Sequence, residues 1–191
     1  MKWNYWVISN SNKGVQPPQE WYQILQIIYE HNLLDNKNIN KIEVAAFTIR
    51  GSRTLRWIIL ENDPQFASER NSLEVAKKLL ANFLELVDLK IIIPEKLKIF
   101  LSEYLTNETT KCSLCREEIT STMFLLDGRK DQDAVNMGHI EPLNTRDQNQ
   151  SNHYAENVCW QHRRCNYMQG ERNIETALNY MFGILKRHGK I

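Results

Sequence analysis

The amino-acid sequence predicts an α+β protein with an N-terminal region, residues 1–105, and a C-terminal region, residues 106–191. Three observations support this prediction. Apolar residues recur at helical spacing in several segments. Two segments rich in β-branched and aromatic residues flank Gly51-Ser52 in the first region. Two pairs of cysteine or histidine residues stand far apart in the second region, beyond a polar stretch at residues 106–110.

The composition is that of an ordinary globular protein. The chain has 191 residues, of which 42% are hydrophobic and 25% charged. No apolar run approaches the roughly 20 residues that span a membrane. Trp3, Asn4 and Tyr5 interrupt any apolar run at the N-terminus, so we expect no signal peptide and a cytoplasmic protein. The net charge of +1 argues against broad, non-specific binding to nucleic acid but allows a localised basic surface.

Helices are expected at three places in the N-terminal region. Pro18 precedes residues 19–29, whose apolar residues follow helical spacing, and proline suits the first turn of a helix. Residues 71–89 begin with the pattern Asn-x-x-Glu, a capping box, and carry a broad apolar stripe. A further helix is expected from Pro94 to about residue 105.

A β-hairpin is expected between the first two of these helices. Residues 42–50 and 53–61 are β-branched and aromatic runs joined by the short turn at Gly51-Ser52. The N-terminal region is therefore predicted as helix, β-hairpin and helices. Three arginines surround the predicted turn: Arg50, Arg53 and Arg56.

The ligand pairs of the C-terminal region are Cys112 with Cys115, and His162 with Cys165. Zinc prefers four sulfur or nitrogen ligands, and two ligands that are two residues apart can chelate from one turn. Cys159 is the alternative to His162, but its longer spacing to Cys165 does not hold both ligands on one turn. In a reducing cytosol such pairs are more often metal ligands than disulfides, so we expect a structural zinc ion, with a redox pair or disulfide as the alternative.

The other elements of the C-terminal region surround these ligands. Residues 134–140 are expected to form a strand, and residues 144–156 a long polar loop. A helix that carries the second ligand pair follows the loop, and Asn173 is placed to cap a last helix.

Three more polar residues accompany the ligand pairs: His139, Asn157 and Asn166. An imidazole with a pKa near ~6.5 can accept a proton at neutral pH. A carboxamide oxygen is a hard ligand that suits magnesium or manganese. Each residue also has an ordinary interpretation: a structural histidine, a helix cap and a solvent-facing helix residue.

The combination of Gly-His-Ile-x-Pro at residues 138–142, Asn157-Val158, and His-x-x-Cys-Asn at residues 162–166 resembles the HNH nucleases, which have a ββα-metal core. The resemblance covers about residues 110–175. It implies that His139 is the general base, that Asn157 holds the loop and the histidine, and that Asn166 binds a catalytic divalent ion. Many family members also carry cysteine pairs that bind a structural zinc.

One position departs from this family pattern. Many members have an aspartate before the base histidine as the second ligand of the catalytic ion, and here that position is Gly138. Candidates for a replacement are Glu141, Asp133, Asn136 and His153.

The resemblance leads us to expect an endonuclease that hydrolyses double-stranded DNA with Mg²⁺ or Mn²⁺, of the restriction or anti-phage type. The N-terminal region would recognise the target, and a homodimer would match the two-fold symmetry of a palindrome. Arg53, Arg163 and Arg164 are expected to contact nucleic acid, with a solvated turn or helix face as the alternative. The alternative function is a non-catalytic zinc module that binds nucleic acid or protein.

Overall fold

The computed structural model describes residues 18–49, 54–143 and 152–191. Its α-helices are α2 (Gln19–Glu30), α3 (Asn36–Phe47), α4 (Glu69–Leu84), α5 (Glu95–Leu101), α6 (Arg163–Gln169) and α7 (Ile174–Arg187). Three short 3-10 helices are η1 (Arg56–Ile58), η2 (Ser121–Phe124) and η3 (Ala155–Asn157). Strands β1 (Val135–His139) and β2 (Val158–His162) form one antiparallel sheet. The described chain is therefore α+β, and none of its helices is long and apolar enough to cross a membrane.

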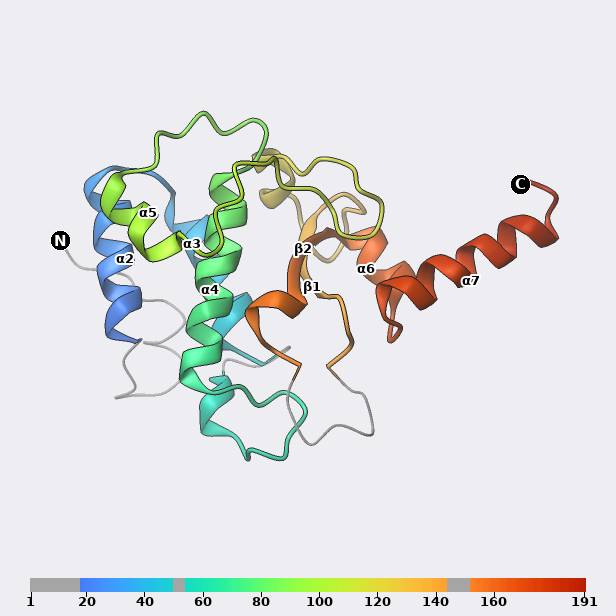
Figure 1. The fold of residues 1–191 in the computed structure, drawn as a ribbon, viewed down its shortest axis with the longest axis horizontal. Coiled ribbons are helices and arrows are strands. Elements are labelled where there is room, and N and C mark those ends of the chain that lie inside the picture. Colours follow the sequence, from blue (N-terminus) through green and yellow to red (C-terminus); the bar gives the residue numbers. More distant parts are fainter. Residues whose placement is uncertain (1–17, 50–53, 144–151) are drawn as a thin grey trace.

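Helix α4 lies at the centre of the molecule, with α2 and α5 on one side and the sheet with α6 on the other (Figure 1). It contacts α3, α5, η1, η3 and β2. This central place explains its broad buried surface, which consists of Ser72, Leu73, Val75, Ala76, Leu79, Leu80, Ala81, Phe83 and Leu84. The helix begins earlier than its sequence pattern predicted, because Ser68 caps it by accepting a hydrogen bond from the Asn71 amide at 3.1 Å. It also ends earlier, at Leu84.

Two other N-terminal helices begin where the prolines predicted. Helix α2 follows Pro18 directly and buries Trp21, Leu25 and Ile28. Helix α5 follows Pro94, although it ends at Leu101 rather than near residue 105. Proline pre-sets the backbone angle of the first turn and has no amide hydrogen that would need a partner there.

The predicted β-hairpin is wrong in its first arm, because residues 36–47 form helix α3. Asp35 caps this helix by accepting a hydrogen bond from the Asn38 amide at 2.8 Å. The β-branched residues occupy a helical face that packs against α4, and this burial outweighs their modest preference for strands. That face consists of Ile39, Ile42, Ala46 and Phe47. The second arm contains η1, and among the described residues its pairing to the first arm is the bridge of Thr48 with Leu55 and the hydrogen bond from the Ile49 amide to the Thr54 carbonyl at 3.0 Å.

The sheet and α6 form one compact unit in the C-terminal region. Strand β1 lies within the predicted range and pairs with β2 in a register that sets Gly138 opposite Cys159 and His139 opposite Val158. The resemblance to a ββα core implied a second strand, but its position was not predicted, because the polar loop was expected to lead directly into a helix that carries His162. His162 is both the last residue of β2 and the N-cap of α6. Helix α6 then contacts both strands.

One aromatic column joins the sheet to the N-terminal helices. Phe124 lies edge-on to Phe83 of α4 at 4.8 Å between ring centroids, and edge-on to Trp160 of β2 at 5.0 Å. Each such pair contributes roughly 0.5–1.5 kcal/mol beyond the area that it buries. The indole nitrogen of Trp160 also donates to the Leu79 carbonyl at 3.0 Å. The sheet is therefore packed on α4, and residues of both predicted regions share one hydrophobic cluster.

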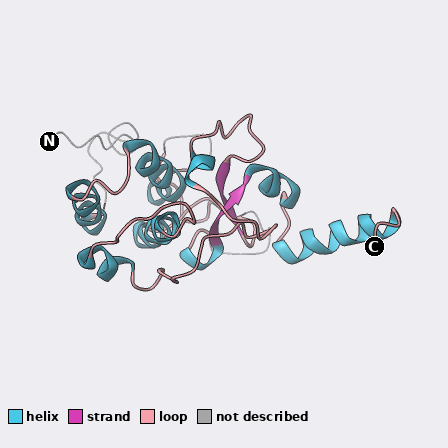
Figure 2. Cartoon of the chain, turned by 90° about the horizontal axis from the view of Figure 1, so that it is seen from above, coloured by secondary structure: helices cyan, strands magenta, loops and turns pink. Residues whose placement is uncertain are grey.

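Helix α7 extends away from the rest of the described chain in both views (Figures 1 and 2). Asn173 caps it as predicted, accepting a hydrogen bond from the Thr176 amide at 2.8 Å. Its predicted apolar face is mostly not buried, since Leu178 and Leu185 are each 45% exposed. The amphipathic pattern thus identified the helix but not a packing partner.

Candidate functional site

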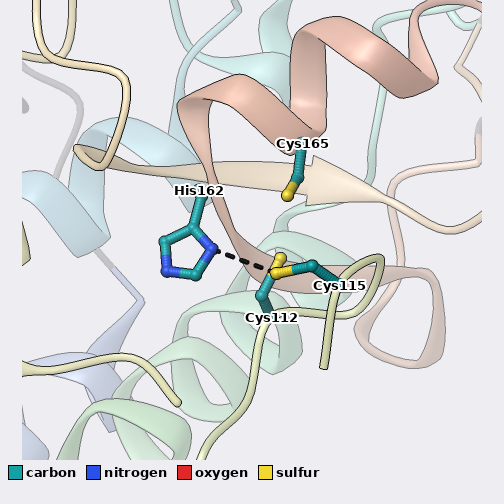
Figure 3. A group of neighbouring side chains, drawn as sticks. All are labelled: Cys112, Cys115, His162 and Cys165. Atoms are coloured by element: carbon teal, nitrogen blue, oxygen red, sulfur yellow. Dashed lines mark hydrogen bonds between the residues drawn. The ribbon is translucent and has the colours of Figure 1, made fainter. Parts of the chain in front are cut away.

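Three cysteines and one histidine come together from two distant segments of the chain (Figure 3). Cys112 and Cys115 lie on the loop before η2, His162 ends β2, and Cys165 lies in the first turn of α6. Their ligand atoms all lie within 4.8 Å of one another. The Sγ of Cys115 is 3.4 Å from the Nδ1 of His162. The two ligand pairs predicted from the sequence therefore meet.

Local backbone hydrogen bonds shape the loop that presents Cys112 and Cys115. The Cys112 amide donates to the Glu117 carbonyl at 2.8 Å, and the Arg116 amide donates to the Cys112 carbonyl at 3.0 Å. Arg116 adopts a left-handed φ of 64°. This tight turn explains why ligands two residues apart can point to one place.

The electrostatics of the cluster call for a cation. Burial, followed by the neighbouring thiols of Cys112 and Cys115, raises the pKa of Cys165 to about 12. Burial raises the pKa of Cys112, but backbone amides of Cys115, His162 and Leu114 outweigh it and lower that pKa. Three thiolates this close would repel one another, and a divalent ion removes that penalty. Three sulfurs and an imidazole nitrogen are donors that zinc prefers, so this group could hold a zinc ion.

Cys159 lies outside this group, as the spacing argument predicted. Its side chain is half-buried on β2, where its Sγ lies 3.2 Å from the Ser113 hydroxyl. Burial raises the pKa of its thiol to about 11, so it remains a neutral polar contact between the sheet and the cysteine loop.

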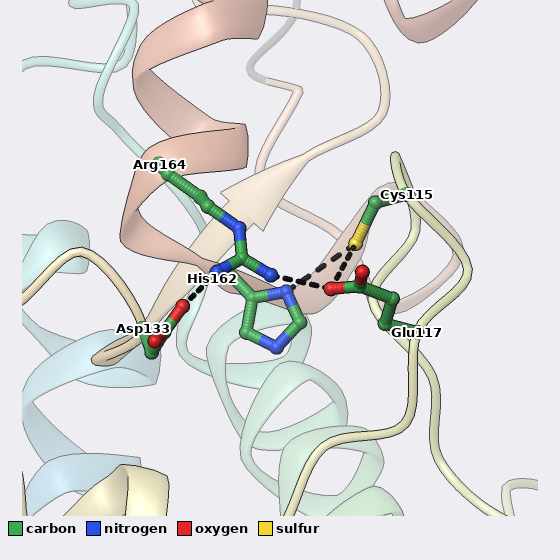
Figure 4. A network of polar contacts seen from close by, with 5 residues as sticks. All are labelled: Cys115, Glu117, Asp133, His162 and Arg164. Atoms are coloured by element: carbon green, nitrogen blue, oxygen red, sulfur yellow. Dashed lines mark hydrogen bonds and ion pairs between the residues drawn. The ribbon is translucent and has the colours of Figure 1, made fainter.

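Arg164 joins the cysteine loop to the start of β1 (Figure 4). Its guanidinium forms ion pairs with both Glu117 and Asp133. Glu117 in turn lies 3.5 Å from the Cys115 Sγ. Arg164 was expected to contact nucleic acid, and Asp133 was a candidate metal ligand; in the structure these two side chains pair with each other.

His139 lies at the end of β1 and is partly exposed. Its Nε2 is 3.3 Å from the Nδ1 of His153. Burial, and then the positive charge of Arg56, lowers the pKa of His139 to about 4. The imidazole is therefore neutral at physiological pH and has the lone pair that a proton acceptor needs.

Asn157 clamps the segment that follows His139. Its side-chain oxygen accepts from the Glu141 amide at 2.7 Å, and its nitrogen donates to the Glu141 and Asn152 carbonyls at 2.8 and 2.6 Å. The Ile140 amide donates to the Asn157 carbonyl at 2.9 Å. Asn157 thus ties the chain after β1 to the chain before β2, at only 2% exposure.

Asn166 follows Cys165 on α6 and is half-buried. Its side-chain nitrogen is 3.4 Å from the Met137 carbonyl of β1. This contact uses the nitrogen of the Asn166 carboxamide and not its oxygen. Asn166 is therefore held between the cysteine cluster and β1, close to the strand that carries His139.

Gln161 of β2 lies among these residues, and the sequence did not single it out. Gln169 donates its amide nitrogen to the carbonyls of His139 and Arg172 at 2.6 and 3.0 Å, so the Gln169 oxygen must be the acceptor of the contact on its other side. That contact is the Gln161 nitrogen at 2.8 Å, which also donates to Ser113 at 2.6 Å. Because the nitrogen makes both contacts, the Gln161 oxygen points away from Ser113 and Gln169. It is buried and has no hydrogen-bond partner among the described residues.

The remaining predicted site residues occupy different surroundings. Arg163 lies over the Tyr167 ring at 4.7 Å and donates to the Lys130 carbonyl at 3.4 Å. Arg53 and Arg50 lie outside the described residues. Arg56 is not a solvated turn residue, because it is only 2% exposed and donates to the Gln65 carbonyl at 3.0 Å.

Comparison with solved structures reveals a similar fold. The chain matches a "Crystal structure of a type II restriction endonuclease" with a TM-score of 0.65 and 22% sequence identity, over 88% of this chain and 82% of that one. Protein-family models and curated proteins give no match. At this identity the match establishes the shared fold.

Proposed function

We propose that this protein is an HNH-type endonuclease that hydrolyses phosphodiester bonds of double-stranded DNA with Mg²⁺ or Mn²⁺, in restriction or anti-phage defence. The observation that carries the proposal is the position of His139, at the end of β1 and beside α6, the helix whose first turn carries Cys165 of the Cys112/Cys115/His162/Cys165 cluster. The fold shared with a type II restriction endonuclease supports it. A scaffold that only bound zinc would need neither His139 nor Asn166.

The residues of the chain divide the work. His139 would take the proton of the attacking water, because a neutral imidazole accepts a proton while its conjugate acid does not. Asn157 would hold the loop after His139 so that the ring keeps one direction toward the phosphate. Zinc would fasten the cysteine loop to β2 and α6, which a sheet of two short strands cannot do by packing alone.

The residues also fit a second, catalytic ion. The Gln161 oxygen is a buried acceptor without a partner among the described residues, and it lies beside Gly138, where many HNH nucleases have an aspartate. We propose that the Gln161 and Asn166 oxygens hold this ion, since carboxamide oxygens suit Mg²⁺ and Mn²⁺. Such an ion stabilises the charge that develops on the phosphate and the leaving oxygen.

Two contact proposals extend this function. Arg163 and Arg53 would bind DNA phosphates. Arg164 would bind a phosphate through the guanidinium N–H groups that do not contact Glu117 or Asp133. Two copies of the chain would act together on a palindromic site. Sedimentation of the protein with and without a palindromic duplex tests the second point.

The other candidate function is a zinc module without catalysis. The glycine at position 138 and the net charge of +1 favour it.

Digestion of plasmid DNA with Mg²⁺ or Mn²⁺ separates the two functions. The proteins compared are the wild type, His139→Ala and the control His188→Ala; His188 is exposed and follows the end of α7. We expect only His139→Ala to lose cleavage while it keeps its zinc and fold. Equal cleavage by all three proteins, or none by the wild type across metals and DNA substrates, contradicts the endonuclease.

A further inference from the structure

His153 lies directly behind His139 and has no solvent exposure. Its Nδ1 is 3.3 Å from the Nε2 of His139, and its Nε2 is 2.8 Å from the backbone carbonyl of Ala46. The two rings are tilted by 54°, with their centroids 5.6 Å apart. A chain of contacts therefore runs from helix α3, which contains Ala46, through His153 to His139.

The Ala46 carbonyl is available because of its place in α3. The helix ends at Phe47, and the last carbonyls of a helix have no amide partner within it. The C-terminal end of a helix also carries partial negative charge, which favours an N–H group pointing at it. An imidazole N–H is thus a well-suited partner for this carbonyl.

The hydrogen positions along this chain follow from donor and acceptor chemistry. A carbonyl oxygen only accepts, so the proton of a neutral His153 is on Nε2, and its Nδ1 carries a lone pair. Burial, followed by repulsion from Arg56 and from the protonated form of His139, lowers the pKa of His153 well below its ordinary value, so the ring is neutral at physiological pH. The Nε2 of His139 must then be the donor to His153. In a neutral ring this leaves the lone pair of His139 on Nδ1.

We propose that His153 is a positioning residue that selects Nδ1 of His139 as the proton-accepting atom and fixes the direction of the ring. The proposal rests on the proposed role of His139 as the base. It makes helix α3 of the N-terminal region part of the support of the catalytic histidine. It also removes His153 from the candidates for a metal ligand, because both of its ring nitrogens contact other groups.

The alternative is that His153 only fills space behind β1. A filler would need the volume of the ring but not its acceptor atom. Leucine and asparagine share a side-chain skeleton of four heavy atoms branched at Cγ, and they differ in whether they can accept a hydrogen bond from His139. The pair His153→Leu and His153→Asn therefore separates the two roles.

We would measure cleavage by zinc-loaded wild type and both variants at neutral pH, with zinc content and thermal unfolding recorded for each. We expect His153→Leu to lower kcat by about 10- to 100-fold with KM nearly unchanged, the effect typical of removing a residue that orients a reacting group. His153→Asn should recover most of this loss. Equal kcat for the two variants, or a loss confined to KM, would overturn the proposal.

The second measurement does not depend on cleavage. Long-range ¹H–¹⁵N spectra of the wild type labelled at its five histidines report which ring nitrogen carries the proton. We expect His139 and His153 both to be protonated at Nε2 and not at Nδ1. A proton on the Nδ1 of either ring refutes the proposal even if DNA is cleaved. The expected tautomers in a protein that cleaves no DNA would instead reject the endonuclease and leave this contact chain intact.

Discussion

The side chain of Gln161 occupies the space in which a side chain at position 138 would begin. A Cβ placed on Gly138 would lie 2.1 Å from the Gln161 Oε1 and 2.4 Å from its Cδ. Gln161 is held there by Ser113 and Gln169, so it cannot move aside without losing those hydrogen bonds. The glycine before the proposed base is therefore explained by its neighbour on β2.

The first prediction concerns this close approach. We expect Gly138→Ala to reduce the free energy of unfolding by about 1–3 kcal/mol, because overpacking a filled site forces side chains or backbone to shift. In the double variant with Gln161→Ala the added methyl group has room, so the two effects should not add. Urea unfolding of the single and the double variant measures both free energies. Gly183→Ala is the control, since its Cβ would meet only the end of Arg187 at 3.4 Å; an equal loss there would contradict this explanation.

The second prediction concerns the oxygen of Gln161. We expect Gln161→Met, which keeps a side chain of similar length but lacks the amide oxygen, to weaken Mn²⁺ binding by about tenfold or more. Titration of zinc-loaded protein with Mn²⁺, followed by electron paramagnetic resonance, measures this. Gln26→Met is the control, because it makes the same substitution at an exposed position of α2, away from Gly138. Unchanged Mn²⁺ binding by Gln161→Met would remove Gln161 from the ligand set.

The third prediction concerns the cysteine cluster. We expect Cys112→Ser to release zinc and to lower Tm by about 10 °C or more, because structural zinc contributes several kcal/mol and each corresponds to about 2–4 °C in a chain of this size. Elemental analysis and thermal unfolding test both effects. Cys159→Ser should keep its zinc, since Cys159 lies outside the cluster. Zinc loss from that control, or retention by Cys112→Ser, would show that the ligands are different.

The fourth prediction is a pH dependence of cleavage. Because burial and Arg56 lower the pKa of His139 to about 4, the ring should stay neutral and competent as the pH falls through its ordinary value of 6.5. Cleavage by the base mechanism should then decline only near pH 4, where the ring gains a proton and loses its lone pair. The rate should be measured against pH with the zinc content checked at each point, because protons also compete for the thiolates. A midpoint near 6.5 without zinc loss would show a solvated imidazole.

The fifth prediction concerns Glu43, which is 2% exposed on α3 and accepts a hydrogen bond from the Trp21 indole at 3.0 Å. Burial raises its pKa to about 7, so the folded protein holds a proton that the unfolded chain loses above pH 4.5. The folded protein therefore loses stability as the pH rises from 4.5 to about 7, and its stability stays low above that. Glu43→Gln keeps the acceptor for Trp21 and cannot ionise. We expect it to gain about 1–3 kcal/mol over the wild type at pH 8 and about a quarter of that gain at pH 5.

Urea unfolding at the two pH values tests the prediction for Glu43. A gain of the same size at both would mean that the substitution acts through packing rather than through ionisation. A loss at pH 8 would mean that the carboxylate is stabilised by a group that glutamine cannot serve.

Local signals predicted much of the fold and part of the site. The prolines before α2 and α5 and the cap of α7 act within a few residues, so the sequence alone locates them. The same signals failed at residues 42–47, where β-branched residues suggested a strand and packing of Ile42 and Phe47 against α4 made a helix. The strand preference of a residue depends on the neighbours that its side chain packs against, and a local stretch of sequence does not show those neighbours.

The sequence by itself determined which residues could bind zinc, because two-residue spacing places both members of a pair on one turn. It also singled out His139, Asn157 and Asn166. Only the tertiary structure decided what surrounds them: Ala46 and His153 behind His139, Gln161 against Gly138, and Leu79 under Trp160. These contacts join residues as many as 107 positions apart. Backbone carbonyls and buried amides have no sequence signature, since every residue carries a carbonyl and packing alone selects the one that is used.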